Sequence, residues 1–595
     1  MLSFKKPDVD QFFKTFNIHD FAVSHDESQL ILSTNLSGKY NLWAMDLPNI
    51  FPYPLTFNDQ ISYGIEFDKQ GRFVIAGFDK DGDENAQLYA FPPKGGELKP
   101  IRLAEGHRHT YPFLSEDGKR LYYTSTKDDS TFLKGYCYNL ETEEEAVVIH
   151  GDDAATYLLT ASPEEKSYLY LKHFANTNTL AYVKTINEEI LLTPKTDEQH
   201  TVSAADFVSE EELFLITNYS EDLSYLAKFN LTTKKFTKVL QLEGEDLNEL
   251  KIDRERNILY FVSSKGVSDK LYSYDFTHQT LTELETPASI VEKLHISKEG
   301  NLYLLTRSAT RPANIFKKSH SQSEWTALTN YGVPGVPEEE LVEPEILTYP
   351  SFDGLEIEAL LFKAKEDTTN GHVILWPHGG PQAAERKEFR SLFQFLVNRG
   401  YSIFAPNFRG SSGYGLKFMK MVEGDWGHGP RLDNIEGLEF LIKNGYADRE
   451  KILLMGGSYG GYMALLLHGR HADYFKAVVD IFGPSDLFSF INSVPEHWKP
   501  VMNQWVGDPV KDREKLIEYS PITYLENMVK PMLVIQGAMD PRVIKAESDQ
   551  IVDALQKNGV NVKYMVFEDE GHGFTKKENE IKVYRAVLDF FNQYI

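Results

Sequence analysis

A sevenfold repeat in the first half of this 595-residue chain restricts its fold more than any other feature. Each copy opens with a turn that begins at Ser or Asp, and a run rich in aromatic and β-branched residues follows, such as Arg120-Leu-Tyr-Tyr-Thr124. Such runs predict strands. The turns begin, at spacings of 44, 47, 47, 47, 44 and 44 residues, at Ser24, Asp68, Ser115, Ser162, Ser209, Asp253 and Ser297. The period is too long for a β-helix and too regular for a β-sandwich, so we expect a seven-bladed β-propeller of four-stranded blades.

The pattern changes after about residue 330, where several prolines mark a linker. Beyond them, apolar runs alternate with segments of helical periodicity such as Phe389 to Asn398, Asn434 to Asn444 and Lys545 to Asn558. This alternation predicts an α/β domain with a mostly parallel, doubly wound sheet covered on both faces, whose ligand site lies beyond the carboxyl ends of the strands. The strand-like runs are Leu355 to Phe362, His372 to Trp376, Tyr401 to Ala405, Lys451 to Met455, Ala477 to Phe482, Met532 to Gln536 and Val562 to Phe567.

Three domains follow from these patterns. Residues Pro7 to Phe16 have a helical pattern and precede the first blade. We expect an N-terminal helical arm over residues 1–17 that packs on another domain, the propeller over 18–330 and the catalytic domain over 331–595.

One serine in the second half is surrounded by glycines. The segment Gly456-Gly-Ser-Tyr-Gly460 has the pattern G-x-S-x-G, and it lies between a predicted strand and the predicted helix Tyr462 to His468. A sharp strand-to-helix turn leaves little room for side chains and exposes the serine oxygen near the helix N-terminus. We therefore expect Ser458 to be a nucleophile.

A serine hydroxyl needs a base, and the base needs a residue that orients it. In an α/β-hydrolase these partners follow in the order Ser, Asp, His. Asp540 and His572 each come just after a predicted strand and in that order. Asp569 is the competing acid, but it lies in the same loop as the histidine and cannot easily reach behind its ring. We expect Ser458, Asp540 and His572 to form the catalytic triad, whereas the alternative for His572 is an exposed loop histidine.

An oxyanion hole requires two N–H donors directed at the developing charge. One should be the backbone N–H of Tyr459, the residue after the nucleophile. The other should come from the loop Pro377-His-Gly-Gly-Pro381, which follows an early strand and whose glycines allow the backbone to approach substrate. We expect Gly380 to be the second donor.

Taken together, these segments resemble the prolyl oligopeptidase family of serine peptidases, and most closely its acylaminoacyl-peptidase branch. The resemblance covers the hydrolase domain by motif and the propeller by its repeat. The matching segments are His378-Gly-Gly-Pro381, Asn407-Phe-Arg-Gly-Ser-Ser-Gly-Tyr-Gly415, Gly456-Gly-Ser-Tyr-Gly-Gly461, Ser520-Pro-Ile522, Gly537-Ala-Met-Asp-Pro-Arg-Val543 and Glu570-Gly-His-Gly573.

The resemblance implies hydrolysis of short peptides through an acyl-enzyme on Ser458, with a propeller that excludes folded substrates and with no cofactor or metal. It implies that Arg542 binds the substrate backbone, with a structural ion pair as the alternative. Phe408 stands where the family often has tyrosine. The segment Pro484 to Trp505 corresponds to the specificity pocket. Its apolar candidates, some of which can be plain core, are Phe488, Phe490, Ile491, Trp498 and Trp505.

Charge and composition exclude some partners. The net charge of −26 repels phosphate backbones and anionic lipids, so we expect no nucleic-acid or membrane partner. The N-terminus has no apolar signal-peptide segment, and no apolar run reaches the length of a membrane span, so we expect a cytoplasmic protein. The oligomeric state stays open, with a homo-oligomer among the alternatives.

Three functions remain open at this stage. The first is a serine peptidase acting on short peptides, including N-acylated ones. The second is an esterase or small-molecule amide hydrolase with the same catalytic residues, and the third is a binding protein with an inactive hydrolase domain. Relatives that release dipeptides hold the free N-terminus with propeller acids, but Glu210, Glu211 and Glu212 lie at a repeat turn. The sequence therefore does not decide among dipeptidyl release, acylaminoacyl release and internal cleavage.

Overall fold

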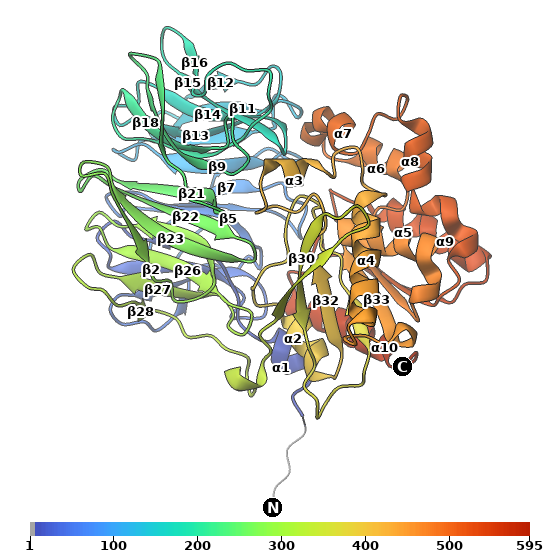
Figure 1. The fold of residues 1–595 in the computed structure, drawn as a ribbon. Helices are drawn as coiled ribbons and strands as arrows, with labels where there is room; N and C mark the ends of the chain where they lie inside the picture. The colour runs from blue at the N-terminus through green and yellow to red at the C-terminus, as the bar shows by residue number, and fades with distance from the viewer. Residues whose placement is uncertain (1–5) are drawn as a thin grey trace, which may run out of the picture.

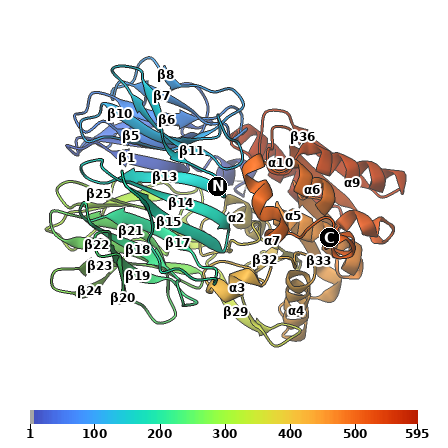
Figure 2. The same cartoon turned by 90° about the horizontal axis from the view of Figure 1, so that it is seen from above.

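A computed structural model describes residues 6–595, which form a propeller and an α/β domain lying against each other (Figures 1 and 2). The first part contains seven separate four-stranded antiparallel sheets, and this confirms the seven-bladed propeller. Blades 1 to 4 contain β1 (Ile18–Val23), β2 (Gln29–Thr34), β3 (Asn41–Asp46), β4 (Tyr53–Pro54); β5 (Ser62–Phe67), β6 (Val74–Phe78), β7 (Gln87–Phe91), β8 (Lys99–Arg102); β9 (His109–Leu114), β10 (Arg120–Ser125), β11 (Lys134–Asn139), β12 (Glu145–His150); β13 (Ala155–Ala161), β14 (Tyr168–Ala175), β15 (Asn178–Lys184) and β16 (Glu189–Leu191). Blades 5 to 7 contain β17 (Val202–Phe207), β18 (Glu212–Thr217), β19 (Tyr225–Asn230), β20 (Lys235–Leu240); β21 (Asp246–Asp253), β22 (Ile258–Lys265), β23 (Ser268–Asp275), β24 (Thr280–Leu284); β25 (Ile290–Ile296), β26 (Leu302–Arg307), β27 (Asn314–Lys318) and β28 (Thr326–Ala327).

Side chains close the ring between the first and the last blade. The four strands of each blade follow one another in chain order, so no sheet is shared between the chain ends. Instead, Phe21 and Leu32 of blade 1 pack in one buried cluster with Leu305 of blade 7. The Glu27 carboxylate also accepts hydrogen bonds from Tyr303 Oη (2.6 Å) and Lys317 Nζ (2.7 Å). These bonds help to hold the pKa of Glu27 at about 2, against the opposing effect of burial.

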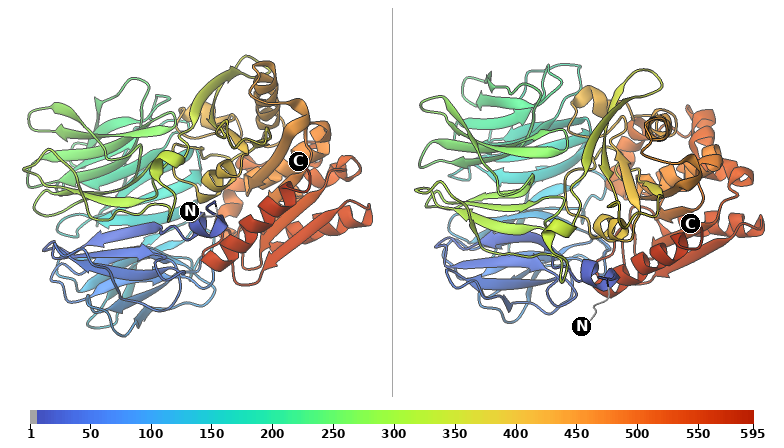
Figure 3. Two further views of the ribbon diagram at one scale, coloured as in Figure 1. Left: turned by 90° about the horizontal axis from the view of Figure 1, so that it is seen from below. Right: turned by 60° about the horizontal axis from the view of Figure 1, so that its bottom comes forward.

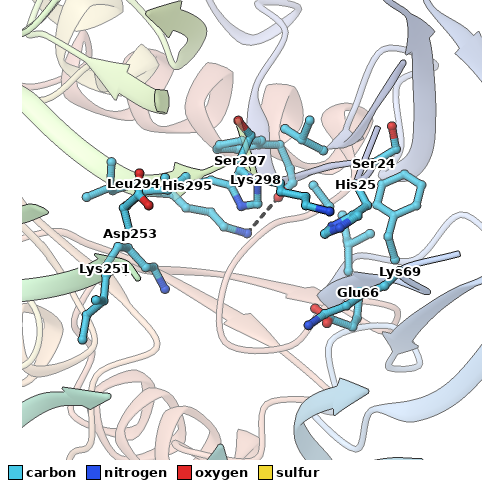
Figure 4. Close-up of a pocket in the computed structure, with 18 of the residues that line it drawn as sticks. Ser24, His25, Glu66, Lys69, Lys251, Asp253, Leu294, His295, Ser297 and Lys298 are labelled. Atoms are coloured by element: carbon cyan, nitrogen blue, oxygen red, sulfur yellow. Dashed lines mark hydrogen bonds between the residues drawn. The ribbon is translucent and has the colours of Figure 1, made fainter. Parts of the chain in front are cut away.

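The repeat turns face away from the second domain. Loops after the second strand of several blades contact that domain, for example through Asp222 Oδ1, which accepts from Lys417 N at 2.7 Å. The repeat turns lie at the other strand ends, where they surround a cavity of about 690 Å³ with charged walls (Figure 4). There Lys293 Nζ donates to Phe21 O at 2.8 Å and also pairs with Asp20. This distal cavity is therefore on the side of the propeller opposite the catalytic domain.

The second domain is built on one eight-stranded sheet in the order β29-β30-β32-β31-β33-β34-β35-β36. The first two pairs of neighbours in that order are antiparallel and the other five pairs are parallel. Seven strands match the expected runs, whereas the edge strand β29 was not predicted. The strands are β29 (Glu345–Pro350), β30 (Glu356–Phe362), β31 (Val373–Leu375), β32 (Ser402–Pro406), β33 (Ile452–Gly457), β34 (Val478–Ile481), β35 (Met532–Gly537) and β36 (Val562–Phe567).

Helices cover both faces of this sheet (Figure 3). Successive side chains of a strand point to opposite faces, so in β33 Leu454 belongs to the core on one side and Leu453 to the core on the other. The first core includes residues of α4, α5 and α9, and the second includes residues of α2 and α10. The helices are α2 (Ser391–Asn398), α3 (Leu416–Lys420), α4 (Gly429–Lys443), α5 (Tyr459–His471), α6 (Leu487–Ser493), α7 (Lys499–Trp505), α8 (Arg513–Tyr519), α9 (Lys545–Lys557) and α10 (Lys577–Phe591).

The N-terminal helix α1 (Val9–Phe13) is shorter than the expected span and packs on the catalytic domain rather than on the propeller (Figure 3). Asp8 caps it, because the carboxylate accepts the N–H of Val9 and Gln11 completes a capping box. Phe13 stacks on Tyr584 of α10 with ring centroids 4.7 Å apart. The chain therefore begins, within the described residues, on the domain in which it also ends.

Candidate active site

Ser458 sits in a strained turn between β33 and α5. Its backbone has φ 58° and ψ −123°, a left-handed conformation that L residues rarely adopt. The flanking glycines are required by space: a Cβ at Gly456 would lie 2.1 Å from Gly460 O, and one at Gly460 would lie 2.1 Å from Pro377 O. This is the geometry of a nucleophile elbow. The helix begins at Tyr459, three residues earlier than expected, directly after the serine.

A continuous line of hydrogen bonds joins the three residues expected to form the triad. His572 Nε2 lies 2.9 Å from Ser458 Oγ, and His572 Nδ1 lies 2.6 Å from Asp540 Oδ2. The second oxygen of Asp540 accepts the backbone N–H groups of Arg542 (2.9 Å) and Val543 (3.0 Å). A carboxylate held in this way fixes the tautomer in which Nδ1 carries the proton and Nε2 accepts from the serine. The alternative acid, Asp569, pairs instead with Lys576 and Asn579.

The loop that follows β31 passes directly over Ser458. A Cβ at Gly379 would lie 3.4 Å from Ser458 Cβ, and Gly380 has φ 124°. The buried His378 anchors this loop, because its Nε2 lies 2.8 Å from Ser411 Oγ and its ring stacks on Phe408 at 4.2 Å. Gly380 and Tyr459 both border the cavity that contains Ser458, which is compatible with the expected pair of oxyanion donors.

An apolar cavity of about 100 Å³ opens beside Ser458. Its walls include three of the residues named from the sequence, Phe490, Trp498 and Trp505, together with Pro484 and Val543. Two further candidates do not line it: Ile491 is core, and Phe488 packs under Arg513. Trp426 also lines the cavity, but it was not predicted from the sequence. Its ring packs edge-on against Tyr459, with centroids 5.1 Å apart, and against Trp505, with centroids 5.0 Å apart. It comes from a loop between α3 and α4 that has neither strand nor helix periodicity.

The propeller contributes an acid that binds one of the residues lining this cavity. Glu84, in the loop between β6 and β7, accepts a hydrogen bond from Arg542 Nε at 2.7 Å. Arg542 lines the cavity with 43% of its side chain exposed, so it forms an ion pair and still faces the space beside Ser458. Glu210, in contrast, bonds to Ser162 and to the backbone of Glu164 at a repeat turn. Glu84 was missed because only the docking of the domains brings it here.

The same propeller loop also touches the loop that carries His572. A Cβ at Gly82 would lie 2.8 Å from Gly571 N, so the two backbones are in direct contact. Lys576 Nζ bridges the domains, donating to Asp81 Oδ1 at 2.8 Å and to Asp569 Oδ2 at 2.7 Å. The loop that carries His572 therefore packs against the propeller as well as against its own domain.

A seven-bladed propeller docked on an α/β-hydrolase domain, with a hydrogen-bonded Ser, His and Asp between them, defines the class of propeller-bearing serine hydrolases. Residues 387–595 match the family model described as prolyl oligopeptidase family. Residues 387–595 therefore form a prolyl oligopeptidase family domain, as the sequence motifs indicated.

Relatives and solved structures of this kind are similar to the chain. Dipeptidyl aminopeptidase BIII of Pseudoxanthomonas mexicana is 41% identical over 224 residues, which is 37% of this chain and 32% of that protein. The matched region spans about a third of the length of the first curated relatives. A puromycin-hydrolyzing peptidase of Mycobacterium tuberculosis superimposes with a TM-score of 0.87 at 18% identity, over 99% of this chain and 96% of that one. The acylaminoacyl peptidase of Pyrococcus horikoshii does so with 0.75 at 20% identity, over 99% and 97%.

The described residues carry two further observations about ligands and location. Among residues 6–595 there is no helix with the length and hydropathy needed to cross a bilayer. In the same range, His, Cys, Asp and Glu side chains nowhere gather in a group of three or more that could hold a metal ion.

Proposed function

We propose that this chain is a serine peptidase that hydrolyses short peptides through an acyl-enzyme on Ser458. In this proposal His572 is the general base and acid, and Asp540 orients it. The backbone N–H groups of Tyr459 and Gly380 stabilise the oxyanion, and Arg542 binds the substrate backbone. The single observation that carries the proposal is the line of hydrogen bonds from Ser458 Oγ to His572 to Asp540, with distances of 2.9 and 2.6 Å.

This geometry supports each step of the proposed reaction. Ser458 Oγ attacks the scissile carbonyl carbon while its proton passes to His572 Nε2, and the carbonyl oxygen becomes an oxyanion. His572 then gives the proton to the leaving amine as the C–N bond breaks. Water repeats the sequence on the acyl-enzyme, which releases the acid and restores Ser458. The strained backbone of Ser458 keeps Oγ at the cavity rather than in the helix.

The apolar cavity beside Ser458 supports a preference for substrates with an apolar side chain on the acyl side of the cleaved bond. Its aromatic walls offer no charged partner apart from Arg542 at the rim. A lysine side chain placed there would lose its hydration without compensation, and an aspartate would have to compete with Glu84 for Arg542. The test is a series of short peptides that differ only at this residue, with products identified by mass spectrometry and Ser458→Ala as the inactive control. Equal cleavage of the aspartyl and leucyl peptides, or cleavage by Ser458→Ala, would contradict the proposal.

A dipeptidyl aminopeptidase is the second candidate, and Glu84 favours it. Its carboxylate binds Arg542, which lines the cavity, and there it can also meet a substrate ammonium group. The discriminating experiment compares a free-amine peptide with its N-acetyl form in the wild type, in Glu84→Gln and in the exposed control Glu97→Gln. If Glu84 holds an ammonium group, only Glu84→Gln loses the free-amine substrate, while the acetylated one is spared. A preference of the wild type for the acetylated peptide supports acylaminoacyl-peptidase activity.

The domain limits 1–17, 18–330 and 331–595, the cytoplasmic location and a homo-oligomeric state belong to the same proposal. Limited proteolysis checks the limits at the linker near residue 330. Fractionation of cells checks the location, and light scattering after size-exclusion chromatography checks the oligomeric state.

A further inference from the structure

A second cavity, of about 240 Å³, lies between blade 4 of the propeller and the catalytic domain, and we call it the interface cavity. It adjoins the cavity that contains Ser458, because both are lined by Gly380, Trp498 and Trp505. Its other lining residues are Tyr157, His173 and Asn176 of the propeller and Gln382, His497 and Val501 of the catalytic domain. The interface cavity is large enough for one amino-acid side chain.

Two polar groups of the interface cavity have no partner in the protein. Within residues 6–595, neither the Tyr157 hydroxyl nor the His497 ring forms a hydrogen bond, and neither is sealed off as the indole N–H of Trp505 is. Other polar side chains of the lining are engaged, since Asn176 Nδ2 donates to Gln382 Oε1 at 2.7 Å. The cavity therefore offers a hydroxyl and an imidazole to a ligand that can form hydrogen bonds.

The lining of the interface cavity is uncharged. Burial, together with the positive charges of Arg108 and Arg542, lowers the pKa of His497 to about 4, and burial also lowers the pKa of His173, so both rings are neutral at pH 7. A ligand acid would have to compete for the two arginines with Glu84, which lies 2.7 Å from Arg542 and 3.9 Å from Arg108. An ionised side chain would therefore lose its hydration there, whereas a neutral amide would exchange it for hydrogen bonds.

The position of the interface cavity indicates which part of a substrate reaches it. The leaving amine must lie next to His572, which protonates it, but the lining found within residues 6–595 includes no residue of the loop that carries His572. The cavity is therefore on the acyl side of the cleaved bond. In an extended peptide, side chains two residues apart point to the same face and are about 7 Å apart. With one side chain in the cavity beside Ser458, the side chain two residues before it faces the neighbouring cavity.

We propose that the interface cavity is a second substrate subsite, which binds an uncharged polar side chain such as that of glutamine, two residues before the side chain held beside Ser458. Tyr157 and His497 form the hydrogen bonds to it. This proposal rests on the proposed function and narrows its substrate class to peptides with at least three residues before the cleaved bond. A dipeptidyl aminopeptidase has only two residues on that side of the bond, so the interface cavity would stay empty.

Isothermal titration calorimetry on the full chain with Ser458→Ala measures binding without cleavage. The probes are three peptides acetyl-Xaa-Gly-Leu-Ala-Ala in which Xaa is glutamine, methionine or glutamate, side chains of similar length. In the same background, Tyr157→Phe removes only the hydroxyl and His497→Phe removes the ring nitrogens. Tyr111→Phe is the matched control, because that exposed ring packs edge-on against Tyr157, with centroids 5.8 Å apart, but does not line the cavity. Each variant is checked for an unchanged unfolding midpoint.

The glutamine peptide should bind about tenfold more tightly than the methionine and glutamate peptides, the effect of one to two neutral hydrogen bonds. Tyr157→Phe and His497→Phe should each weaken binding of the glutamine peptide alone, by about fivefold, and Tyr111→Phe should leave it unchanged. Equal binding of the glutamine and methionine peptides, tighter binding of the glutamate peptide, or an equal loss in Tyr111→Phe and Tyr157→Phe would overturn the proposal.

Cleavage by the protein with Ser458 intact separates this proposal from the proposed function. If that protein cleaves all three peptides after leucine while Ser458→Ala binds them equally, the peptidase stands and the subsite is refuted. If it cleaves none of them while Ser458→Ala binds the glutamine peptide most tightly, the subsite stands and peptide hydrolysis is refuted.

Discussion

The contact between Gly82 of the propeller and Gly571 of the histidine loop allows the effect of displacing His572 to be measured apart from the effect of backbone strain. In Gly82→Ala the new Cβ would lie 2.8 Å from Gly571 N, whereas ordinary contacts begin at 3.4 Å. The loops must therefore separate by about 0.6 Å. Because a shift of about 1 Å in a catalytic group can cost on the order of 100-fold in rate, we expect kcat/KM to fall about tenfold.

Gly71→Ala is the matched control for this change. Gly71 lies in the same blade and also has a positive φ, +69° against +81°, but a Cβ there would meet nothing within 4 Å. Both variants add the same kind of backbone strain, about 1 kcal/mol, whereas only Gly82→Ala adds the steric clash with Gly571. The assay is the hydrolysis of a cleavable peptide, with thermal unfolding measured in parallel. If kcat/KM of Gly82→Ala stays within twofold of that of Gly71→Ala, the propeller loop does not position His572.

Three further predictions follow from particular side chains. Asp540→Asn should lower kcat by about 10⁴-fold with little change in folding, because the amide favours the wrong tautomer of His572; steady-state kinetics and circular dichroism check it, and a loss below tenfold would contradict the role of Asp540. Trp498→Ala should lower kcat/KM about tenfold or more for peptides with an apolar side chain at the cleaved bond, while Trp325→Ala on the propeller leaves it unchanged. Burial raises the pKa of Asp480 to about 8, so the native protein keeps a proton that the unfolded carboxyl releases, and the free energy of unfolding should fall by about 1.4 kcal/mol per pH unit between pH 5 and 8. Asp480→Asn should remove this slope, and unfolding midpoints measured across that range that stay parallel in the two proteins would refute it.

The sequence predicted those parts of the molecule that local pattern determines. The blades could be counted because each repeats the same turn and strand pattern. Ser458, Asp540 and His572 could be predicted to lie together because each follows an apolar strand, and parallel strands bring their carboxyl ends to one edge of a sheet. The family motifs added the loop with Gly380.

The parts that were missed depend on contacts between distant segments. Strand β29 lies between Pro344 and Pro350, which favoured a linker, but an edge strand tolerates proline because one side of it needs no hydrogen bonds. Trp426 comes from a loop without periodicity, and Glu84 from a polar propeller turn. Trp426 reaches the cavity beside Ser458, and Glu84 reaches Arg542, only through tertiary packing, so no pattern along the chain marks them.

The most direct test of the central claim is intact-protein and peptide mass spectrometry after reaction with a serine-directed phosphonate. Wild type should gain one phosphonate, located on Ser458, and Ser458→Ala should gain none. His572→Ala should react at least about 100-fold more slowly, because Ser458 then lacks its base. A label on another residue, or equal rates in the wild type and His572→Ala, would contradict an activated Ser458 at this site.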